Sequence, residues 1–223
     1  MNIQTRLQSL HQRINSALEQ ANRKDGARLL AVGKSHPPQA LLKAYQSGLR
    51  HFGENYLQEA LAKQAALGHC EIIWHFIGPI QSNKTRAIAS HFDWVHSVDR
   101  LKIAERLNQH RPDCLPTLNV CIQVNVGGEA SKSGVAMNQV AALAEAIQSF
   151  PKLRLRGLMT IPPPASDLES QRKYFSQLRE LKASLDFNWD MLSMGMSADL
   201  EAAILEGATM VRVGTALFGP RKT

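Results

Sequence analysis

The residue of this sequence best suited to covalent chemistry is Lys34, which ends the apolar run Leu29–Lys34 and precedes a polar, proline-containing loop. This pattern places an ammonium group where a buried strand enters a loop. Burial disfavours the charged form of a lysine, so its pKa falls and the amine can attack a carbonyl carbon to form a Schiff base. The alternative is that Lys34 only marks a strand end, with its ammonium group reaching solvent.

Two segments near the C-terminus predict an anion site. Ser193–Asp199 runs from an apolar stretch into a helical pattern, and Gly195 in it permits a close approach to the backbone. Ser197 would lie near the helix N-terminus, where unpaired N–H groups attract anions. Gly214 and Thr215 follow the last apolar stretch and would add N–H donors. Either segment alone could be an ordinary cap or turn, but together they predict a phosphate site.

Four other polar residues each allow two interpretations. Arg212 lies inside an apolar stretch and needs either a carboxylate partner, such as Glu201, or the ring nitrogen or carboxylate of a ligand. His75 is either a core histidine or a site residue, and no HExxH spacing supports a metal. Asn55 could cap a helix or contact a ligand. Lys132 lies in a polar loop that is either a solvated connection or a lid carrying a second amine.

Hydrophobic periodicity predicts the elements that must position these residues. Short apolar runs alternate with helical patterns along the chain. The expected strands are Leu29–Lys34, His51–Glu54, Ile72–Ile77, Trp94–Val98, Leu118–Val126, Leu155–Thr160, Met191–Met194 and Met210–Val213. The expected helices are Ile3–Asn22, Pro38–Ser47, Tyr56–Leu67, Lys84–Ser90, Arg100–His110, Met137–Phe150, Asp167–Leu185 and Ala198–Glu206.

Eight strands that alternate with helices predict an α/β protein, a single (β/α)8 TIM barrel with an extra N-terminal helix. The alternative is a doubly wound open sheet, which is weakened by the lack of a GxGxxG motif after an early strand. In a barrel the carboxyl ends of the strands form one mouth, and phosphate often binds after the seventh and eighth strands. Lys34, Asn55, His75, Ser197, Arg212 and Thr215 all lie at or near such ends.

Composition narrows the class of protein. The 223 residues are 44% hydrophobic and 20% charged, which suits one domain spanning 1–223, with 1–27 forming a helix packed on the barrel. The net charge of +7 is dispersed and comes with no nucleic-acid motif, so a phosphate-bearing small molecule fits it equally well. Three unpatterned cysteines indicate neither a disulfide framework nor zinc. Without a signal peptide or membrane span, we expect a cytoplasmic protein.

Seven segments resemble the small pyridoxal 5′-phosphate (PLP) homeostasis proteins, which are similar to the barrel domain of alanine racemases and share the fold type III of PLP proteins. The resemblance covers nearly the whole chain. The matching segments are Ala31–Lys34, His51–Tyr56, His75–Lys84, Ser131–Gly134, Arg156–Met159, Ser193–Asp199 and Arg212–Gly219.

The resemblance implies PLP as the cofactor, held as a covalent aldimine on Lys34. It implies that Arg212 faces the pyridine nitrogen, which keeps that nitrogen unprotonated and makes the ring a poorer electron sink. Ser197, Gly214 and Thr215 would hold the phosphate, and Asn55 and His75 would line the ring pocket. The whole cofactor-binding set is Lys34, Asn55, His75, Met194, Ser197, Arg212, Gly214 and Thr215.

The resemblance also implies a carrier rather than an enzyme. Racemases have a second β domain and a tyrosine base from a dimer partner, and this sequence ends four residues after Gly219. We expect a monomer that supplies PLP to apo-enzymes through transient contacts, with Lys132 as a candidate acceptor during transfer. An amino-acid racemase or decarboxylase remains the alternative function, and a Schiff-base aldolase acting on a sugar phosphate is a third.

Overall fold

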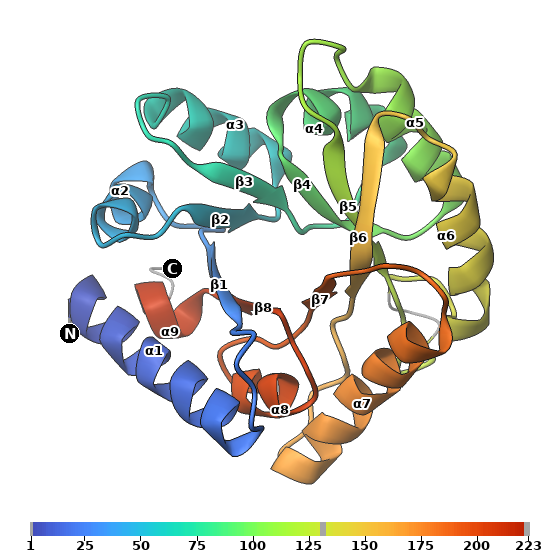
Figure 1. The fold of residues 1–223 in the computed structure, drawn as a ribbon. Coiled ribbons are helices and arrows are strands. Elements are labelled where there is room, and N and C mark those ends of the chain that lie inside the picture. The colour runs from blue at the N-terminus through green and yellow to red at the C-terminus, as the bar shows by residue number, and fades with distance from the viewer. Residues whose placement is uncertain (1, 130–132, 221–223) are drawn as a thin grey trace.

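Eight parallel strands close into a barrel in the order β1 to β8, with helices outside it (Figure 1). The computed structural model describes residues 2–129 and 133–220. The strands are β1 (Arg28–Val32), β2 (His51–Glu54), β3 (Ile73–Phe76), β4 (Trp94–Val98), β5 (Leu118–Gln123), β6 (Leu153–Met159), β7 (Met191–Ser193) and β8 (Met210–Val213). The (β/α)8 barrel is confirmed, and the open-sheet alternative is excluded by the pairing of β1 with β8.

The helices form a ring around the barrel. They are α1 (Ile3–Gln20), α2 (Pro38–Gln46), α3 (Leu57–Ala66), α4 (Thr85–His91), α5 (Leu101–His110), α6 (Val140–Gln148), α7 (Leu168–Ser184), α8 (Leu200–Leu205) and α9 (Thr215–Phe218), with single 3-10 turns at Ser82–Lys84 and Met137–Gln139. Within the described ranges, no helix combines the length and the hydropathy of a membrane span.

The extra N-terminal helix fills the place that the short α9 leaves open in the ring. Figure 1 shows α1 beside α8 and α9, where its apolar stripe of Leu7, Leu10, Ile14 and Leu18 is buried. Asn2 caps α1 by accepting a hydrogen bond from the Thr5 N–H at 2.9 Å. The first helix of the chain therefore packs against its last two.

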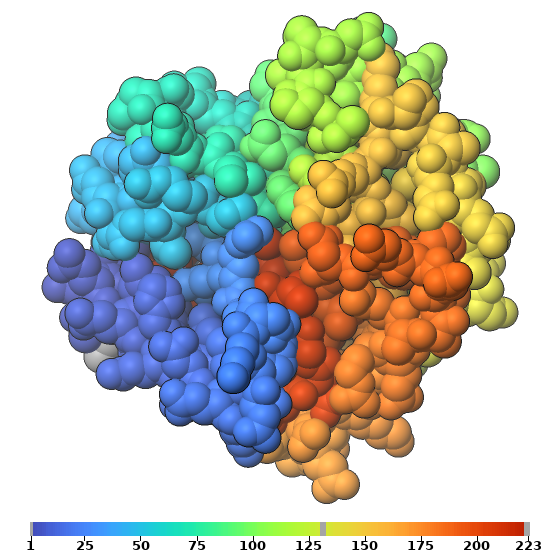
Figure 2. All heavy atoms as spheres, viewed as in Figure 1, coloured from blue at the N-terminus to red at the C-terminus, as the bar shows by residue number. Residues whose placement is uncertain are grey.

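Two apolar layers follow from the period of two along each strand. Leu29 and Ala31 face outwards and join the large core between strands and helices, whereas Leu30 and Val32 face the barrel interior. Trp94, Cys121, Met159, Met191 and Met210 fill the interior with them. In Figure 2 atoms fill the centre of the ring on the visible face. The interior is a packed core and not a channel.

The interior changes from apolar to polar towards the carboxyl ends of the strands. Two residues after Trp94, Met191 and Met210 on the same strands come His96, Ser193 and Arg212, all buried. Since alternate residues share a face, these polar side chains form the next layer of the barrel.

The expected element boundaries need several corrections, of which three follow. β1 ends at Val32, so Lys34 lies in a turn rather than in the strand. β5 ends at Gln123 instead of Val126. α8 begins at Leu200, so Ser197 lies three residues before the helix and in the preceding loop. The sequence pattern also missed α9 because four residues are too few to show a helical period.

Candidate functional site

A pocket of about 240 Å³ opens at the carboxyl ends of β1, β2, β7 and β8. Six of the eight predicted site residues line it. Its lining comprises Val32, Lys34, Asn55, Ile77, Ile161, Met196, Ser197, Ala198, Arg212, Gly214 and Thr215. The pocket thus combines an amine, a guanidinium group, an amide and two hydroxyls against aliphatic walls.

Arg212 forms the floor of this pocket and is almost fully buried. Its guanidinium group donates to the carbonyl of Ser193 at 2.5 Å, to Ser193 Oγ at 3.0 Å and to the carbonyl of Thr160 at 2.8 Å. Burial lowers the pKa of Arg212 to about 10, so it remains a cation at neutral pH. Glu201, which the sequence offered as a carboxylate partner of Arg212, is wrong, because it pairs with Arg13 of α1 at 2.6 Å.

A chain of three histidines continues from Arg212 through the barrel interior. His96 Nδ1 lies 2.8 Å from Ser193 Oγ, and its Nε2 lies 2.8 Å from His75 Nδ1. His75 Nε2 in turn lies 2.9 Å from His51 Nδ1. Burial lowers the pKa of His51 to about 4 and of His96 to about 3, and it lowers the pKa of His75 well below its usual value. All three rings are therefore neutral at pH 7.

One continuous set of tautomers satisfies these hydrogen bonds with neutral rings. Arg212 can only donate, so Ser193 Oγ accepts from it and can give its own proton to His96 Nδ1. In that set His96 donates from Nε2 to His75, and His75 from Nε2 to His51. The chain orders the guanidinium group from below with one continuous set of tautomers.

The loops after β7 and β8 form one wall of the pocket. Ser197 Oγ accepts a hydrogen bond from the Ala216 N–H at 3.2 Å, which joins the two loops. A Cβ at Gly214 would lie 3.2 Å from the Val32 carbonyl oxygen, so a glycine lets the start of α9 lie close to β1. Ser197, Gly214 and Thr215, which the sequence predicts as a phosphate site, are adjacent here.

Asn55 lines the same pocket, directly after β2. Its Oδ1 is buried and has no hydrogen-bond partner among the described residues, so the pocket presents an acceptor that a ligand can satisfy. A Cβ at Gly78 would lie only 2.1 Å from the Asn55 carbonyl oxygen. Only glycine lets these two loops approach so closely.

Two predicted site residues do not reach the pocket. His75 is fully buried one layer below it, in the histidine chain and stacked on Trp94 with ring centroids 5.4 Å apart. Met194 is buried in the outer core with Leu200 and Ala203, because it is one residue out of phase with the inward-facing Ser193. Lys132 lies outside the described residues.

Sequence reasoning overlooked His51 and His96. The sequence pattern could have indicated such a chain. His75 and His96 lie on the neighbouring strands β3 and β4, and the alternation of side chains along each strand makes both of them face inwards. Sequence reasoning also assigned no role to Glu54, the last residue of β2, or to Glu59 and Lys63 of α3, which form hydrogen bonds beside the turn that carries Lys34.

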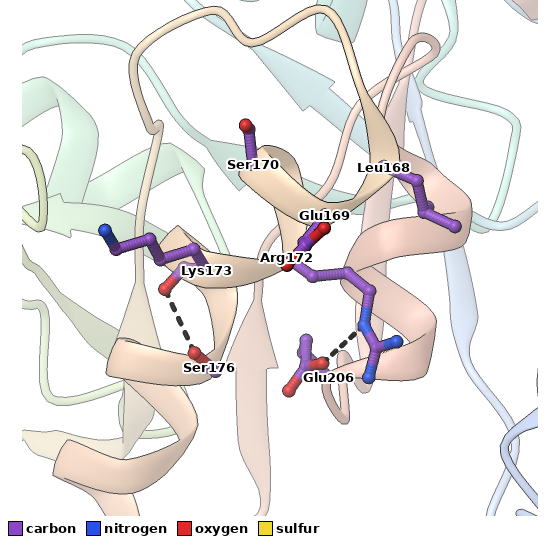
Figure 3. A pocket seen from close by; sticks show the side chains of 7 residues that line it. All are labelled: Leu168, Glu169, Ser170, Arg172, Lys173, Ser176 and Glu206. Carbon is purple, nitrogen blue, oxygen red and sulfur yellow. Dashed lines mark hydrogen bonds and ion pairs between the residues drawn. The ribbon is translucent and has the colours of Figure 1, made fainter.

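A larger hollow of about 720 Å³ lies outside the barrel, along α7 (Figure 3). Its buried carboxylate, Glu206, accepts from Arg172 at 2.7 Å and also pairs with Arg179. The charge of Glu206 is thereby neutralised by the protein itself. Its lining also includes Lys173, Ser170 and Ser176, but in Figure 3 the Lys173 amine and the Ser170 hydroxyl point away from Glu206, and Ser176 donates to the Lys173 carbonyl.

Comparisons with known proteins agree on one family. The family model described as alanine racemase, N-terminal domain, matches residues 5–222. The pyridoxal phosphate homeostasis protein of Pseudomonas aeruginosa is 61% identical over 210 residues, which cover 94% of this chain and 91% of that protein. Its counterpart in Escherichia coli is 51% identical over 199 residues, covering 86% and 85%.

Solved structures show the same fold. The structure of PipY from Synechococcus elongatus with PLP bound is 38% identical, has a TM-score of 0.86, and covers 98% of this chain and 100% of its own. An alanine racemase of Clostridium difficile has a TM-score of 0.72 at 13% identity, and the match covers 97% of this chain and 58% of the racemase. At that identity the racemase shows a shared fold alone.

Proposed function

The chain belongs to the pyridoxal phosphate homeostasis proteins, within the alanine racemase N-terminal domain family, and from this membership we propose that it binds pyridoxal 5′-phosphate in intracellular vitamin B6 homeostasis. In this proposal it holds PLP as an aldimine of Lys34 and supplies it to apo-enzymes. Residues 1–223 act as a single domain, with 1–27 packing on the barrel, and work as a monomer that contacts its recipients transiently.

The observation that carries this proposal is the convergence of Lys34, Arg212, Ser197 and Thr215 in one pocket. Each group suits one part of PLP. An amine suits the aldehyde, hydroxyls beside a glycine suit the phosphate, and a cationic arginine suits an unprotonated pyridine nitrogen. The unpartnered Oδ1 of Asn55 adds an acceptor for a donor on the ligand.

The covalent step needs no further reagent. The neutral amine of Lys34 adds to the aldehyde carbon, and loss of one water leaves the carbon–nitrogen double bond. Addition of water reverses the step and returns both the free aldehyde and the amine. A carrier requires this reversibility, because the cofactor must leave intact.

Borohydride reduction of the PLP-loaded protein, followed by peptide mapping, tests this proposal. We expect the phosphopyridoxyl group on Lys34 in the wild-type protein and its loss from that peptide in Lys34→Ala. A Ser197→Ala, Thr215→Ala double variant should bind PLP more weakly but bind pyridoxal, which lacks the phosphate, as well as wild type does. Labelling of other lysines only would overturn the proposal.

The alternative function is an amino-acid racemase or decarboxylase. The PLP-loaded protein is incubated with amino acids in deuterated buffer, and exchange of the α-proton is followed by NMR. For a carrier we expect no exchange above that of free PLP. Robust exchange that is lost in Lys34→Ala would establish an enzyme instead. A protein that never acquires the yellow absorbance of bound PLP would point to an aldolase.

A further inference from the structure

Lys34 lies in a tight turn whose backbone is held from outside the pocket. The turn comprises Gly33 to His36, since the His36 N–H donates to the Gly33 carbonyl at 3.0 Å. Lys34 is its second residue, and Ser35, its third, has a φ of 62°. This left-handed conformation is strained for a serine, so something outside the turn must stabilise it.

Lys63 of α3 holds the first residue of this turn. Its ammonium group donates to the Gly33 carbonyl at 2.8 Å and to both carboxylate oxygens of Glu54, at 2.8 and 2.9 Å. The Glu54 side chain is 0% exposed and that of Lys63 is 5% exposed. The three N–H groups of Lys63 therefore all have acceptors, and this lysine is not available to react with an aldehyde.

Glu59, also on α3, holds the third residue. Its Oε2 accepts from the Ser35 N–H at 3.0 Å and lies 3.6 Å from Lys63 Nζ. The two residues that flank Lys34 along the chain are thus tied to one charged cluster. A glycine at position 33 leaves room for this cluster, because a Cβ there would lie 2.5 Å from Glu54 Oε1.

We propose that Lys63, Glu54 and Glu59 form a positioning cluster that fixes the Lys34 turn so that the lysine amine meets the aldehyde of the cofactor. This inference rests on the proposed function. The cluster touches the turn and none of its three residues lines the PLP pocket. A buried ion pair gives little net stability compared with apolar residues, so a role in holding a specific geometry explains its presence better.

The sharpest test separates positioning from folding. Lys63→Met alone leaves the Glu54 carboxylate buried without a partner and will destabilise the protein. The double variant Glu54→Leu, Lys63→Met replaces both charged groups with apolar side chains of similar volume, so we expect it to fold with nearly wild-type thermal stability. It still loses the bond to Gly33, and we expect PLP affinity to fall about tenfold, the lower end of the effects of outer-shell partners.

Glu59 offers an independent arm, because its side chain is 42% exposed. Glu59→Ala should lower PLP affinity and shift the pH midpoint of the absorbance of the Lys34–PLP adduct. Glu59→Gln keeps an oxygen acceptor for Ser35 and should restore most of both. Lys152→Met is the matched control, because Lys152 also contacts a carbonyl, that of Arg111 at 3.0 Å, but at the opposite end of the barrel.

The outcomes distinguish this inference from the proposed function. If borohydride reduction of the PLP-loaded wild-type protein gave no adduct on Lys34, the proposed function itself would be contradicted. A normal wild-type adduct, together with unchanged affinity and absorbance midpoint in both Glu59→Ala and the double variant, would overturn only the positioning cluster. Weakened binding in these variants but not in Lys152→Met would support it.

Discussion

Arg212 links the barrel interior to the pocket with a single guanidinium group. Sequence reasoning identified it from its charge within an apolar stretch, and offered Glu201 or a ligand as its partner. The protein acceptors are instead two backbone carbonyls and a hydroxyl. Such acceptors could not be predicted, because they depend on which strands are neighbours and in which register. Residue type therefore predicted the site residue but not its partners.

Arg212→Lys should be costly although it keeps the charge. A lysine lacks the planar fork that reaches Ser193 and Thr160 together, so at least one buried carbonyl loses its donor. We expect a loss of about 1–3 kcal/mol in unfolding free energy and PLP binding at least tenfold weaker. Urea unfolding and a spectral titration measure these. The exposed Arg154→Lys is the control, and equal behaviour of the two variants would contradict this account.

Strands and helices could be predicted well because each has a strong period in the sequence. Five of the eight strands begin and end within one residue of their expected bounds or match them: His51–Glu54, Ile73–Phe76, Trp94–Val98, Met191–Ser193 and Met210–Val213. The positions of Met194 and His75 were harder. Ser193 faces inwards and Met194 outwards, so a single residue of phase separates the interior from the outer core.

The histidine chain between β2, β3, β4 and β7 predicts a pH dependence of stability. Above about pH 6.5 the histidines are neutral in both the folded and the unfolded protein. As the pH falls from 6.5 towards 4, the unfolded chain takes up protons that buried His75 and His96 exclude, so stability falls by up to about 1.4 kcal/mol per pH unit for each. Burial raises the pKa of Glu54 to about 7, which opposes this loss.

His96→Gln isolates the contribution of one histidine. The unfolding free energy of wild type and variant is measured by urea denaturation at intervals between pH 7.5 and 4.5. Because only wild type carries the penalty, the difference between the two should shrink as the pH falls. His11→Gln, on an exposed face of α1, controls for the substitution. A difference that stays constant over this range would contradict the prediction.

Helix α1 contacts a loop of the pocket as well as the apolar core, and its apolar stripe could not indicate this second contact. The sequence predicts an amphipathic helix packed on the barrel, but not which part it covers. In the structure Arg13 pairs with Glu201 of α8 and donates to the Ser197 carbonyl at 3.1 Å. Helix α1 therefore supports the loop that forms one wall of the pocket.

Arg13→Ala should affect both stability and the pocket. The pair with Glu201 is partly exposed, so we expect a loss of only about 1 kcal/mol in unfolding free energy. The binding free energy of PLP should fall by more than this, because the Ser197 carbonyl also loses the hydrogen bond from Arg13. Glu201→Ala breaks the ion pair but leaves Arg13 able to reach Ser197, and should bind PLP better than Arg13→Ala. Equal affinities in the two variants would exclude a role for the contact.

The packing of α1 against α8 and α9 also bears on how the chain is made. On the ribosome α1 emerges well before its partners Leu200–Leu205 and Thr215–Phe218 are made. At the usual rate of synthesis, the apolar stripe of α1 has no packing partner for roughly 10–40 s, until these helices are made. Likewise β1 has no β8 to pair with during this time. The nascent chain therefore exposes an apolar helix face and an unpaired strand edge until α8, β8 and α9 have been made.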